Sequence, residues 1–330
     1  MKFKKPKFWD YKKISIWSIL LFPISIIFLF ASLIVRIFKS LVLRKNYKIP
    51  IICVGNIYVG GTGKTPLASE VFKLIKSIGK NPAFIKKDYD FLFDEIQMLK
   101  KIGPTFLGGN RGVAINNLIM KGHDVAILDD GYQDFSIKPD FSILCFHSNQ
   151  LLGNGFLIPS GPLRERFGSI LRAECIVING YKNLDFENKV NNYLGGKKLP
   201  IFYSKYKIKN IEKLKNKEIT AFAGIGNPSN FFKLLKENNI NVKNTYSFPD
   251  HHNYSDKDYS YLLKLKEQDV LLVTTEKDYS RLSEKIKQSF ECIEVDLGQT
   301  IFFRLSSDQI KRYYQEDEKD DDFEPIIHFF

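Results

Sequence analysis

A glycine-rich stretch that ends in a lysine and a threonine, VGNIYVGGTGKTP, carries the clearest chemical signal in the sequence. The usual phosphate-binding pattern is G-x-x-x-x-G-K-[ST], and Gly63, Lys64 and Thr65 match its end. The first glycine of the pattern would fall at Tyr58, but other glycines nearby supply a permissive backbone. The residues predicted to bind a nucleotide are Tyr58, Val59, Gly60, Gly61, Thr62, Gly63, Lys64 and Thr65.

The segments on either side of this loop are those that a phosphate site requires. The apolar run PIICVG precedes it as a predicted strand, and PLASEVFKLIKS follows with the apolar spacing of a helix. Backbone N–H groups and the N-terminus of that helix can then face phosphate oxygens. Lys64 would reach the β- and γ-phosphates, and Thr65 would bind Mg²⁺. A bare glycine-rich turn is the alternative interpretation.

A second candidate for metal binding follows another predicted strand. The run DVAILDD places Asp129 and Asp130 directly after four apolar residues. One of them, most simply Asp129, would hold Mg²⁺ together with Thr65. An aspartate that caps the turn GYQD is the alternative, and the loop upstream favours the metal.

Short apolar runs alternate with helical patterns over most of the chain. From Ile49 to about Tyr206, the runs PIICVG, AFI, DVAILDD, FSILCF and CIVIN are typical of buried strands. This alternation predicts an α/β fold with a mainly parallel, P-loop NTPase-like sheet. The pattern repeats from about Lys207 in EITAFAGIG, NPSNFFKLLKENN, QDVLLVTTEKD and ECIEVDL, which predicts a second, smaller α/β domain. We therefore expect three parts: residues 1–45, 46–206 and 207–330, the last ending in the acidic tail QEDEKDDDFEP.

An apolar segment of 22 residues without a charge, from Ile14 to Val35, precedes the P-loop domain. It is long enough to cross the hydrocarbon core of a bilayer, and no convincing signal-peptide cleavage site precedes Arg36. Lysines and arginines flank both of its ends, and Pro23 lies in its middle. A full crossing with Lys64 inside would place the N-terminal lysines outside, against the positive-inside tendency. We predict that the segment enters the cytoplasmic leaflet and returns, or lies tilted in it, with both flanks at the anionic inner surface.

The composition sets broader limits. Hydrophobic residues make up 44% of the chain, which supports real cores and argues against global disorder. The net charge of +12 favours an anionic partner, but composition does not choose among nucleic acid, an acidic membrane and a phosphorylated substrate. The four cysteines form no C-x-x-C pair, so a zinc site is not expected. Three of them lie in apolar runs and are predicted to be buried thiols: Cys53, Cys145 and Cys175.

Six motifs in order resemble the tetraacyldisaccharide 4′-kinase family, the lipid A 4′-kinases of the bacterial inner membrane. They are VGNIYVGGTGKTP, DDGYQD, GNGFLIPSGPLRE, FAGIGNPSNFF, FPDHHNY and VTTEKD, and together they cover almost the whole chain. The family's own loop also lacks the first glycine. The resemblance implies transfer of the γ-phosphoryl group of ATP to the 4′-hydroxyl of a tetraacyldisaccharide 1-phosphate, with Mg²⁺ as cofactor.

The same resemblance implies where the protein works and which partners it has. It implies two α/β domains around a cleft, a membrane-inserted N-terminus, and catalytic domains on the cytoplasmic face of the inner membrane. The implied partners are ATP, the lipid A precursor and the membrane surface, with no nucleic acid. A catalytic carboxylate of the family falls on Asp94 in FDEIQ, and a histidine falls on His251 in FPDHHNY.

The chemistry of phosphoryl transfer makes sense of that pair. The reaction needs positioning, charge neutralisation and a group that accepts the hydroxyl proton. We assign Asp94 as the base and His251 as its partner, with Lys64 and Arg164 as further catalytic residues. Arg164 and Arg111 are candidates for phosphate contacts, since guanidinium groups bind phosphate oxygens bidentately. A solvent-facing arginine is the alternative for both.

Two departures from the family pattern stand out. The family's S-R-G-Y-G-G segment is replaced by IKKDYDF, with Lys87 where the arginine would be, and the histidine that ends the family's DDGxQH motif is replaced by Asp134. Two other functions remain open. One is a membrane-tethered P-loop NTPase without a lipid acceptor, and the other is a non-catalytic glycolipid-binding descendant. The intact Gly63-Lys64-Thr65 with Asp129 argues against the second.

Overall fold

The computed structural model describes residues 5–11, 13–42, 47–89, 92–264, 270–293 and 295–298. Contacts between Cα atoms divide the chain into two compact units. The described residues of the first, the P-loop unit, fall within Lys7–Asp88, Ile102–Lys205 and Leu297–Phe330. Those of the second unit fall within Met1–Pro6, Tyr89–Lys101 and Tyr206–Asp296. The predicted acidic tail lies outside the described residues.

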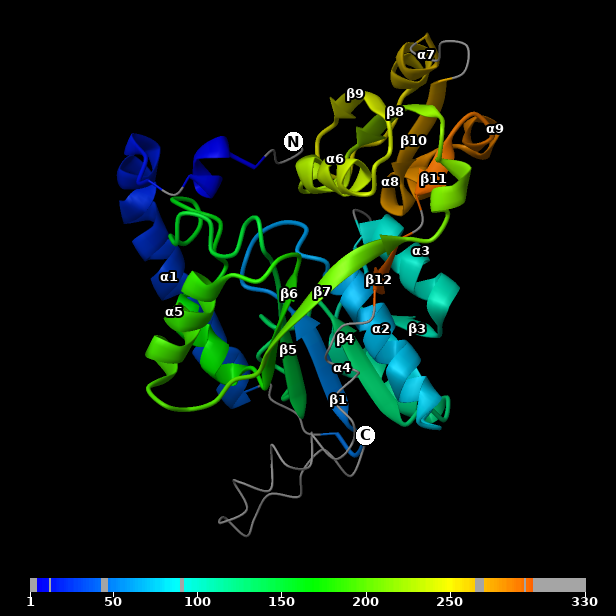
Figure 1. Ribbon diagram of the computed structural model, residues 1–330. Coiled ribbons are helices and arrows are strands. Elements are labelled where there is room, and N and C mark those ends of the chain that lie inside the picture. The colour runs from blue at the N-terminus through cyan, green and yellow to red at the C-terminus, as the bar shows by residue number, and fades with distance from the viewer. Residues whose placement is uncertain are drawn as a thin grey trace. The chain divides into compact units, whose positions relative to one another are not determined.

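An eight-stranded sheet forms the centre of the P-loop unit (Figure 1), in the order β12-β7-β6-β5-β1-β4-β2-β3. The strands are β1 (Ile51–Gly55), β2 (Pro82–Lys86), β3 (Thr105–Leu107), β4 (Val125–Asp129), β5 (Phe141–His147), β6 (Cys175–Asn179), β7 (Ile201–Ile208) and β12 (Val295–Gly298). The pairings from β3 through β7 are all parallel. The prediction of a mainly parallel α/β fold is therefore confirmed.

The P-loop strand lies in the middle of this sheet, between β5 and β4. Strands β1, β2, β4 and β6 are buried at every position, which explains why their sequences are continuous apolar runs rather than alternating ones. The helices attached to this sheet are α2 (Lys64–Ser77), α4 (Arg111–Met120) and α5 (Leu184–Leu194), with the short 3₁₀ helix η3 (Phe167–Arg172). Helix α2 packs on β1, β2 and β4 through Leu67, Val71 and Ile75, one turn apart on one face.

The second unit has its own parallel sheet, in the order β11-β10-β8-β9. Its strands are β8 (Glu218–Ala223), β9 (Val242–Ser247), β10 (Val270–Thr275) and β11 (Glu291–Ile293). Its helices are α3 (Phe93–Ile102), α6 (Pro228–Glu237), α7 (Asp256–Lys264), α8 (Glu276–Arg281), α9 (Glu284–Lys287) and the 3₁₀ helix η4 (Ile211–Lys213). Two clusters of buried residues, one around Leu235 and one around Phe222, make this a core separate from that of the P-loop unit.

The apolar N-terminal segment is a single helix, α1 (Ile16–Val42), which follows the 3₁₀ helix η1 (Lys7–Asp10). Residues Ile16–Leu41 have a mean hydropathy of 2.7 and are long and apolar enough to cross a membrane, by length and composition only. Only 11% of that stretch is buried, so it is not the core helix of the P-loop unit.

One stripe of α1 nevertheless docks on the P-loop unit. Ser18 accepts a hydrogen bond from Asn154 Nδ2 (3.0 Å), and Ser25 donates one to the carbonyl of Leu157 (2.9 Å). At its C-terminal end, Arg36 stacks over the ring of Phe135 at 4.9 Å. These three positions of α1 point in nearly the same direction on a helix of 3.6 residues per turn, and they span roughly 27 Å along its axis.

The three cysteines predicted to be buried thiols are buried, on β1, β5 and β6. Burial raises the pKa of Cys53 and of Cys145 to about 12, so both remain protonated and unreactive. They serve as apolar packing groups, as their positions within the strands indicate.

Candidate functional site

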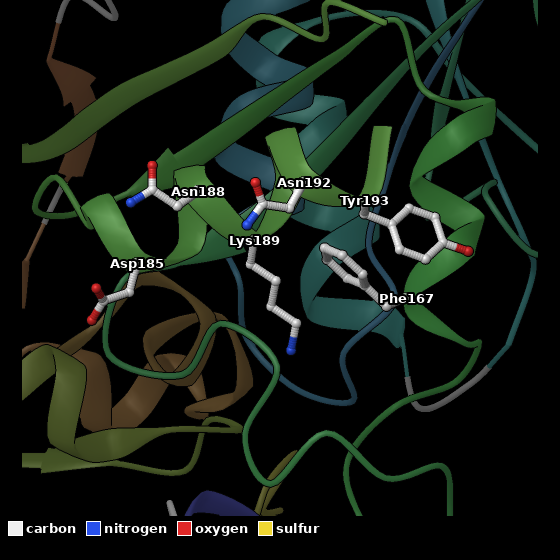
Figure 2. Close-up of a pocket in the computed structure, with 6 residues that line it drawn as sticks. All are labelled: Phe167, Asp185, Asn188, Lys189, Asn192 and Tyr193. Carbon is white, nitrogen blue, oxygen red and sulfur yellow. The ribbon is translucent and has the colours of Figure 1, made fainter. Parts of the chain in front are cut away.

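One surface pocket contains none of the predicted site residues in its lining. It has a volume of about 530 Å³ and is lined by Phe167, Asp185, Asn188, Lys189, Asn192 and Tyr193. Figure 2 shows that five of these side chains come from α5 and one from η3. The ammonium group of Lys189 stacks on Phe167 at 5.3 Å. The glycine-rich loop and Asp129 lie instead at the carboxyl ends of β1 and β4.

The glycine-rich loop joins β1 to α2, as predicted. Gly60 and Gly63 have φ values of 124° and 93°, a conformation that side chains with a Cβ rarely adopt. Gly63 is the N-cap of α2, and no side chain caps the first N–H groups of that helix. A Cβ at Gly61 would meet nothing within 4 Å, so the loop is open on that side. Uncapped helical N–H groups in a glycine-rich loop favour an anion.

Side chains from three strands hold the loop in this shape. Asn56 Nδ2 donates to Thr62 Oγ1 (2.9 Å), and the carbonyl of Thr62 accepts hydrogen bonds from the Cys145 thiol (3.1 Å) and from the Asn179 amide. Thr62 is hydrogen-bonded at both its side chain and its carbonyl, so the backbone that leads into Gly63 is held in place. The loop is preorganised before any ligand arrives.

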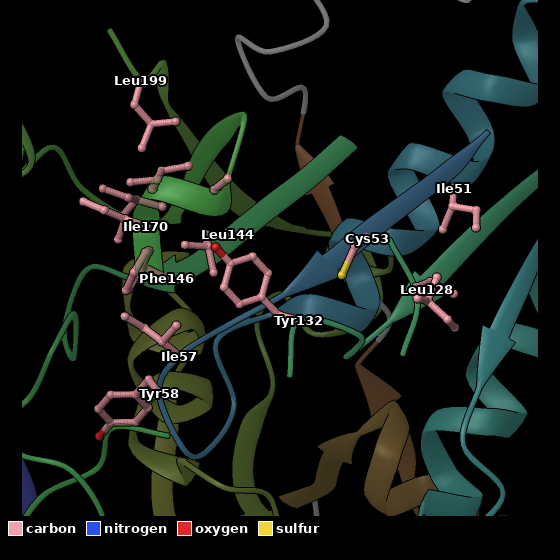
Figure 3. Packing of buried hydrophobic residues seen from close by; sticks show 14 of the residues in the cluster. Ile51, Cys53, Ile57, Tyr58, Leu128, Tyr132, Leu144, Phe146, Ile170 and Leu199 are labelled. Atoms are coloured by element: carbon pink, nitrogen blue, oxygen red, sulfur yellow. The ribbon is translucent and has the colours of Figure 1, made fainter. Parts of the chain in front are cut away.

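Tyr58 stands where the usual pattern has its first glycine, and it is fully buried in the core cluster shown in Figure 3. Its hydroxyl donates a hydrogen bond to Asp10 of η1, and burial followed by that bond raises the pKa of Tyr58 well above its usual range. Beside it, the N–H of Val59 donates to the carbonyl of Pro162 (2.8 Å). The residue therefore ties the loop to the segment that leads into α1.

Asp129 lies at the carboxyl end of β4, next to the P-loop strand. Its Oδ2 accepts a hydrogen bond from Thr65 Oγ1 (3.0 Å) and an ion pair from Lys86 Nζ (2.6 Å). Asp129, Lys86 and Thr65 are 0%, 2% and 3% exposed. Strand β4 pairs in parallel with both β1 and β2, so the carboxyl ends of these three strands lie at one edge of the sheet.

The second aspartate of the pair holds a different set of cations. Asp130 accepts two hydrogen bonds from Arg164 NH1, at 3.0 and 3.1 Å, and lies 3.7 Å from Lys64 Nζ. Its φ of 57° is a left-handed conformation that turns its side chain away from that of Asp129. The structure thus brings Lys64, Thr65, Asp129, Asp130 and Arg164 together in the P-loop unit.

Arg111 is buried beneath this group. Its guanidinium donates to Asp134 Oδ2 (2.9 Å) and to the backbone carbonyl of Asp130 (2.7 Å). Burial raises the pKa of Asp134, but hydrogen bonds from Ser136 and Arg111 outweigh it, and the net pKa lies below the usual value. Asp134 therefore provides the counter-ion of Arg111, and Arg111 also holds the turn at Asp130 through its carbonyl.

The residues around Asp129 fit a magnesium ion. Asp129 Oδ1 is buried and has no hydrogen-bond partner among the described residues, although a buried carboxylate oxygen is costly to leave unsatisfied. The hydroxyl of Thr65 lies on the same carboxylate. Mg²⁺ in proteins is usually bound by one or two such oxygens together with water and substrate phosphates. Thr65 and Asp129 are therefore the residues that would hold it.

Asp94 and His251, predicted as a pair, are neighbours within the second unit. His251 Nδ1 lies 3.2 Å from Asp94 Oδ1, although 157 residues separate them in the chain. Asp94 is in the first turn of α3 and 1% exposed, whereas the His251 side chain is 26% exposed. His251 has a φ of 53°, and its N–H donates to the carbonyl of Gly224 (3.0 Å).

The VTTEKD motif supplies partners for this pair. Thr275 caps α8 by accepting from the N–H of Asp278, and Lys277 forms an ion pair with Glu95, the residue after Asp94. One turn further on, Arg281 NH2 lies 2.5 Å from Asp94 Oδ2. Burial raises the pKa of Asp94, but the His251 hydrogen bond and the charges of Lys277 and Arg281 outweigh it, so its pKa is lowered.

Sequence reasoning did not identify two of these charged residues, Lys86 and Arg281. Lys86 ends an apolar strand run, AFIK, and a lone charge in that position is a signal that could have been used. Arg281 lies four residues after Lys277, and a helix places those two positions on one face. Neither signal identifies the partner carboxylate, which comes from a remote segment in each case.

The chain is similar to known proteins over most of its length. A family model described as tetraacyldisaccharide-1-P 4′-kinase, LpxK, matches residues 17–307. A tetraacyldisaccharide 4′-kinase of Pelagibacter ubique is 40% identical over 284 residues, which cover 86% of this chain and 89% of that protein. One of Parvibaculum lavamentivorans is 32% identical and covers 71% of this chain and 74% of its own length.

The fold has a counterpart among solved structures. The crystal structure of LpxK from Aquifex aeolicus in complex with ATP aligns with a TM-score of 0.67 at 24% sequence identity. The alignment covers 89% of this chain and 98% of the Aquifex chain. It therefore shows the same fold over nearly the whole of both proteins.

Proposed function

Because this chain belongs to the tetraacyldisaccharide-1-P 4′-kinase family and is a kinase of lipid A biosynthesis, we propose that it phosphorylates the 4′-hydroxyl of a tetraacyldisaccharide 1-phosphate. ATP is the proposed donor. The 4′-oxygen forms a bond to the γ-phosphorus, the bond from that phosphorus to the β–γ bridging oxygen breaks, and ADP leaves. The hydroxyl proton passes to a base on the enzyme.

The nucleotide half of the proposal rests chiefly on one observation: Thr65 Oγ1 bonds to Asp129 Oδ2 while the buried Oδ1 keeps no partner. We assign the loop from Tyr58 to Thr65 to ATP, with the backbone from Gly60 to Gly63 around the phosphates. Lys64 would leave Asp130, 3.7 Å away, to bind the β- and γ-phosphates. Bound Mg²⁺ would neutralise charge on the transferring phosphoryl group, held by Thr65 and Asp129. Arg164 would neutralise the charge of Asp130 and contact a phosphate group of ATP.

The acceptor half rests on the second unit. We propose Asp94 as the group that takes the hydroxyl proton and His251 as its partner, since the two side chains are 3.2 Å apart and Asp94 is kept ionised by its surroundings. A carboxylate beside a histidine is a suitable acceptor because each orients the other. The P-loop unit would thus carry the nucleotide site, and the second unit, which includes Tyr89–Lys101, would carry the acceptor pair.

We also propose that α1 places the enzyme on the cytoplasmic face of the inner membrane. Its docked stripe includes Ser18 and Ser25, and the face opposite to it carries large apolar side chains that are 61–79% exposed. These are Ile16, Leu20, Ile27, Ile34 and Leu41. A helix docked along one side over roughly 27 Å and apolar along the other suits a position in one leaflet. Basic residues at both ends, such as Lys13 and Lys39, suit an anionic surface.

The test is a direct assay of the reaction. Purified protein is incubated with ATP, Mg²⁺ and tetraacyldisaccharide 1-phosphate in detergent micelles, and the lipid is analysed by mass spectrometry. We expect one added phosphate, placed by fragmentation on the 4′ position. Consumption of ATP without a phosphorylated lipid would support a membrane-tethered P-loop NTPase instead.

A further inference from the structure

Arg281, at the end of α8, is a charged residue of the second unit that has no role in the reaction proposed above. Its side chain is 8% exposed, and it belongs to none of the predicted site residues. A buried guanidinium is costly unless every N–H group is compensated. The contacts of Arg281 therefore indicate its structural role.

The guanidinium is anchored on one side and reaches the catalytic pair on the other. NH1 donates to the carbonyl of Gly224 (2.9 Å) and lies 3.3 Å from Asp278 Oδ1. NH2 lies 2.5 Å from Asp94 Oδ2 and 3.2 Å from His251 Nδ1. Because NH1 and NH2 belong to one rigid plane, the anchor at Gly224 and Asp278 determines where NH2 is presented.

The anchor is itself rigid. Asp278 is fully buried and accepts hydrogen bonds from the N–H of Gly224 (3.0 Å), the Tyr254 hydroxyl (2.9 Å) and Thr275 Oγ1 (2.7 Å). Both of its oxygens are thus bonded before Arg281 is counted. This network fixes the end of α8, and with it the position of Arg281.

The two oxygens of Asp94 have different partners as a result. Oδ2 is paired with Arg281, and Oδ1 lies next to the ring of His251. Arginine has only donor groups, so its NH2 cannot accept the Nδ1 proton of the histidine, and the carboxylate is the group that can. The ring nitrogen therefore has the Oδ1 of Asp94 beside it as an acceptor, at 3.2 Å.

We propose that Arg281 is a positioning residue of the acceptor pair: it holds the Asp94 carboxylate so that Oδ1 faces His251 Nδ1. This inference rests on the proposed function, since it assigns a role at the same site. Arg281 is not assigned a contact with the substrate, and its effect passes through the Asp94–His251 pair, both members of which its NH2 approaches. The anchor at Gly224 also explains why the VTTEKD segment is needed beside the acceptor pair.

The variants Arg281→Met and Arg281→Lys separate charge from geometry. Arg281→Met should lower kcat about 10- to 100-fold, the usual effect of losing a group that orients a functional side chain, with the KM for ATP unchanged within about twofold. Since Arg281 helps to lower the pKa of Asp94, its loss should also move the acid limb of the kcat–pH profile to higher pH. Arg281→Lys keeps the charge without the planar fork, so the limb should move less while kcat still falls.

A control for folding is needed, because Arg281→Met removes a counter-charge from both Asp94 and Asp278. The double variant Asp94→Asn/Arg281→Met removes one of those charges and should recover part of the lost thermal stability without recovering kcat. Lys243→Ala is the matched control, since Lys243 forms an exposed ion pair with Glu218 in the same unit. It should leave kcat and the pH profile unchanged.

A spectroscopic readout separates this proposal from the proposed function. With ¹⁵N-labelled histidine, the His251 ring signal, assigned by its loss in His251→Gln, reports the Nδ1 proton with or without substrate. We expect that signal to change in Arg281→Met and to stay unchanged in Lys243→Ala. A folded Arg281→Met variant with wild-type kcat, pH profile and ring signal would overturn the role of Arg281. If the wild type adds no phosphate to the lipid, the proposed function fails, and the ring signal still tests Arg281.

Discussion

The ammonium group of Lys86 lies 2.6 Å from Asp129 Oδ2, and the two side chains are 2% and 0% exposed. This ion pair joins the carboxyl ends of β2 and β4 at the edge of the sheet where the glycine-rich loop begins. Lys86 stands within IKKDYDF, the segment that departs from the family pattern. A fixed positive charge thus lies on the aspartate that we assign to magnesium.

Lys86→Met should destabilise the P-loop unit by about 3–5 kcal/mol, because it leaves a buried carboxylate without its counter-ion. Urea unfolding of the purified protein measures this. Lys73→Met is the matched control, since Lys73 forms an exposed ion pair with Glu70 on α2 and should cost about 0–1 kcal/mol. Equal stabilities for the two variants would show that the Lys86–Asp129 pair contributes no more than a surface contact.

Lys64→Ala should lower kcat by roughly two or more orders of magnitude, because a preorganised charge on a transferring phosphoryl group is worth several kcal/mol. The lysine packs at the start of α2 and is 10% exposed, so folding should persist. Steady-state kinetics with the lipid acceptor measures the loss. Lys76→Ala, an exposed position on the same helix, should behave as wild type. A Lys64→Ala enzyme with near wild-type activity would refute the P-loop assignment.

Asp94→Ala and His251→Ala should each lower kcat far more than they raise the KM for ATP. Since the two side chains form one acceptor unit, the double variant should be little worse than the worse single variant. His252→Ala is a close control, because His252 bonds to Asp258 (3.1 Å) and stacks on Phe248 rather than on the pair. Fully additive losses would show that Asp94 and His251 act independently.

Acidification should weaken the folded state through Asp134. Its pKa is lowered below the ordinary value of 3.8, so its pairing with Arg111 stabilises the protein at neutral pH and is lost as the pH falls through the folded-state pKa. Asp134→Asn should be less stable than wild type at pH 7, with the difference shrinking below about pH 4. Thermal unfolding from pH 7 to pH 3 measures it. A difference that stays constant over that range would mean that the carboxylate charge is not the cause.

The position of α1 can be tested by labelling in cells. A single cysteine at Lys13, between η1 and α1, in a variant lacking the four native cysteines, should resist an impermeant thiol reagent on intact spheroplasts and react after lysis. A cysteine at Lys76 in the P-loop unit is the internal control and should behave alike. Robust labelling of the Lys13 position from outside would establish a full crossing and would leave the kinase assignment untouched.

The opposite face of the same helix gives a second test. Ile27→Lys introduces a charge at a residue that is 68% exposed on the apolar stripe, and it should weaken binding to anionic vesicles in a flotation assay. Ser77→Lys, at an exposed serine of α2, is the matched control with the same added charge. Equal binding by both variants would show that the apolar stripe does not contact lipid.

The sequence by itself determined the features that reside in contiguous residues. The loop from Gly60 to Thr65, the buried strands and the apolar helix each follow from local composition and spacing, because a backbone turn, a strand in a parallel sheet or a long apolar helix constrains every residue within it. The prediction that Asp129 would lie near Thr65 also held in the structure, since adjacent parallel strands end at the same edge.

Only the tertiary structure decided which charges meet. Lys86 meets Asp129 because β2 pairs with β4 in the sheet. Arg281 meets Asp94 because the second unit brings α8 against the start of α3. The segment Tyr89–Lys101 belongs with the second unit, although its neighbours in sequence belong to the first. Pairings between residues 43 to 187 positions apart depend on the path of the whole chain, and no local pattern encodes that path.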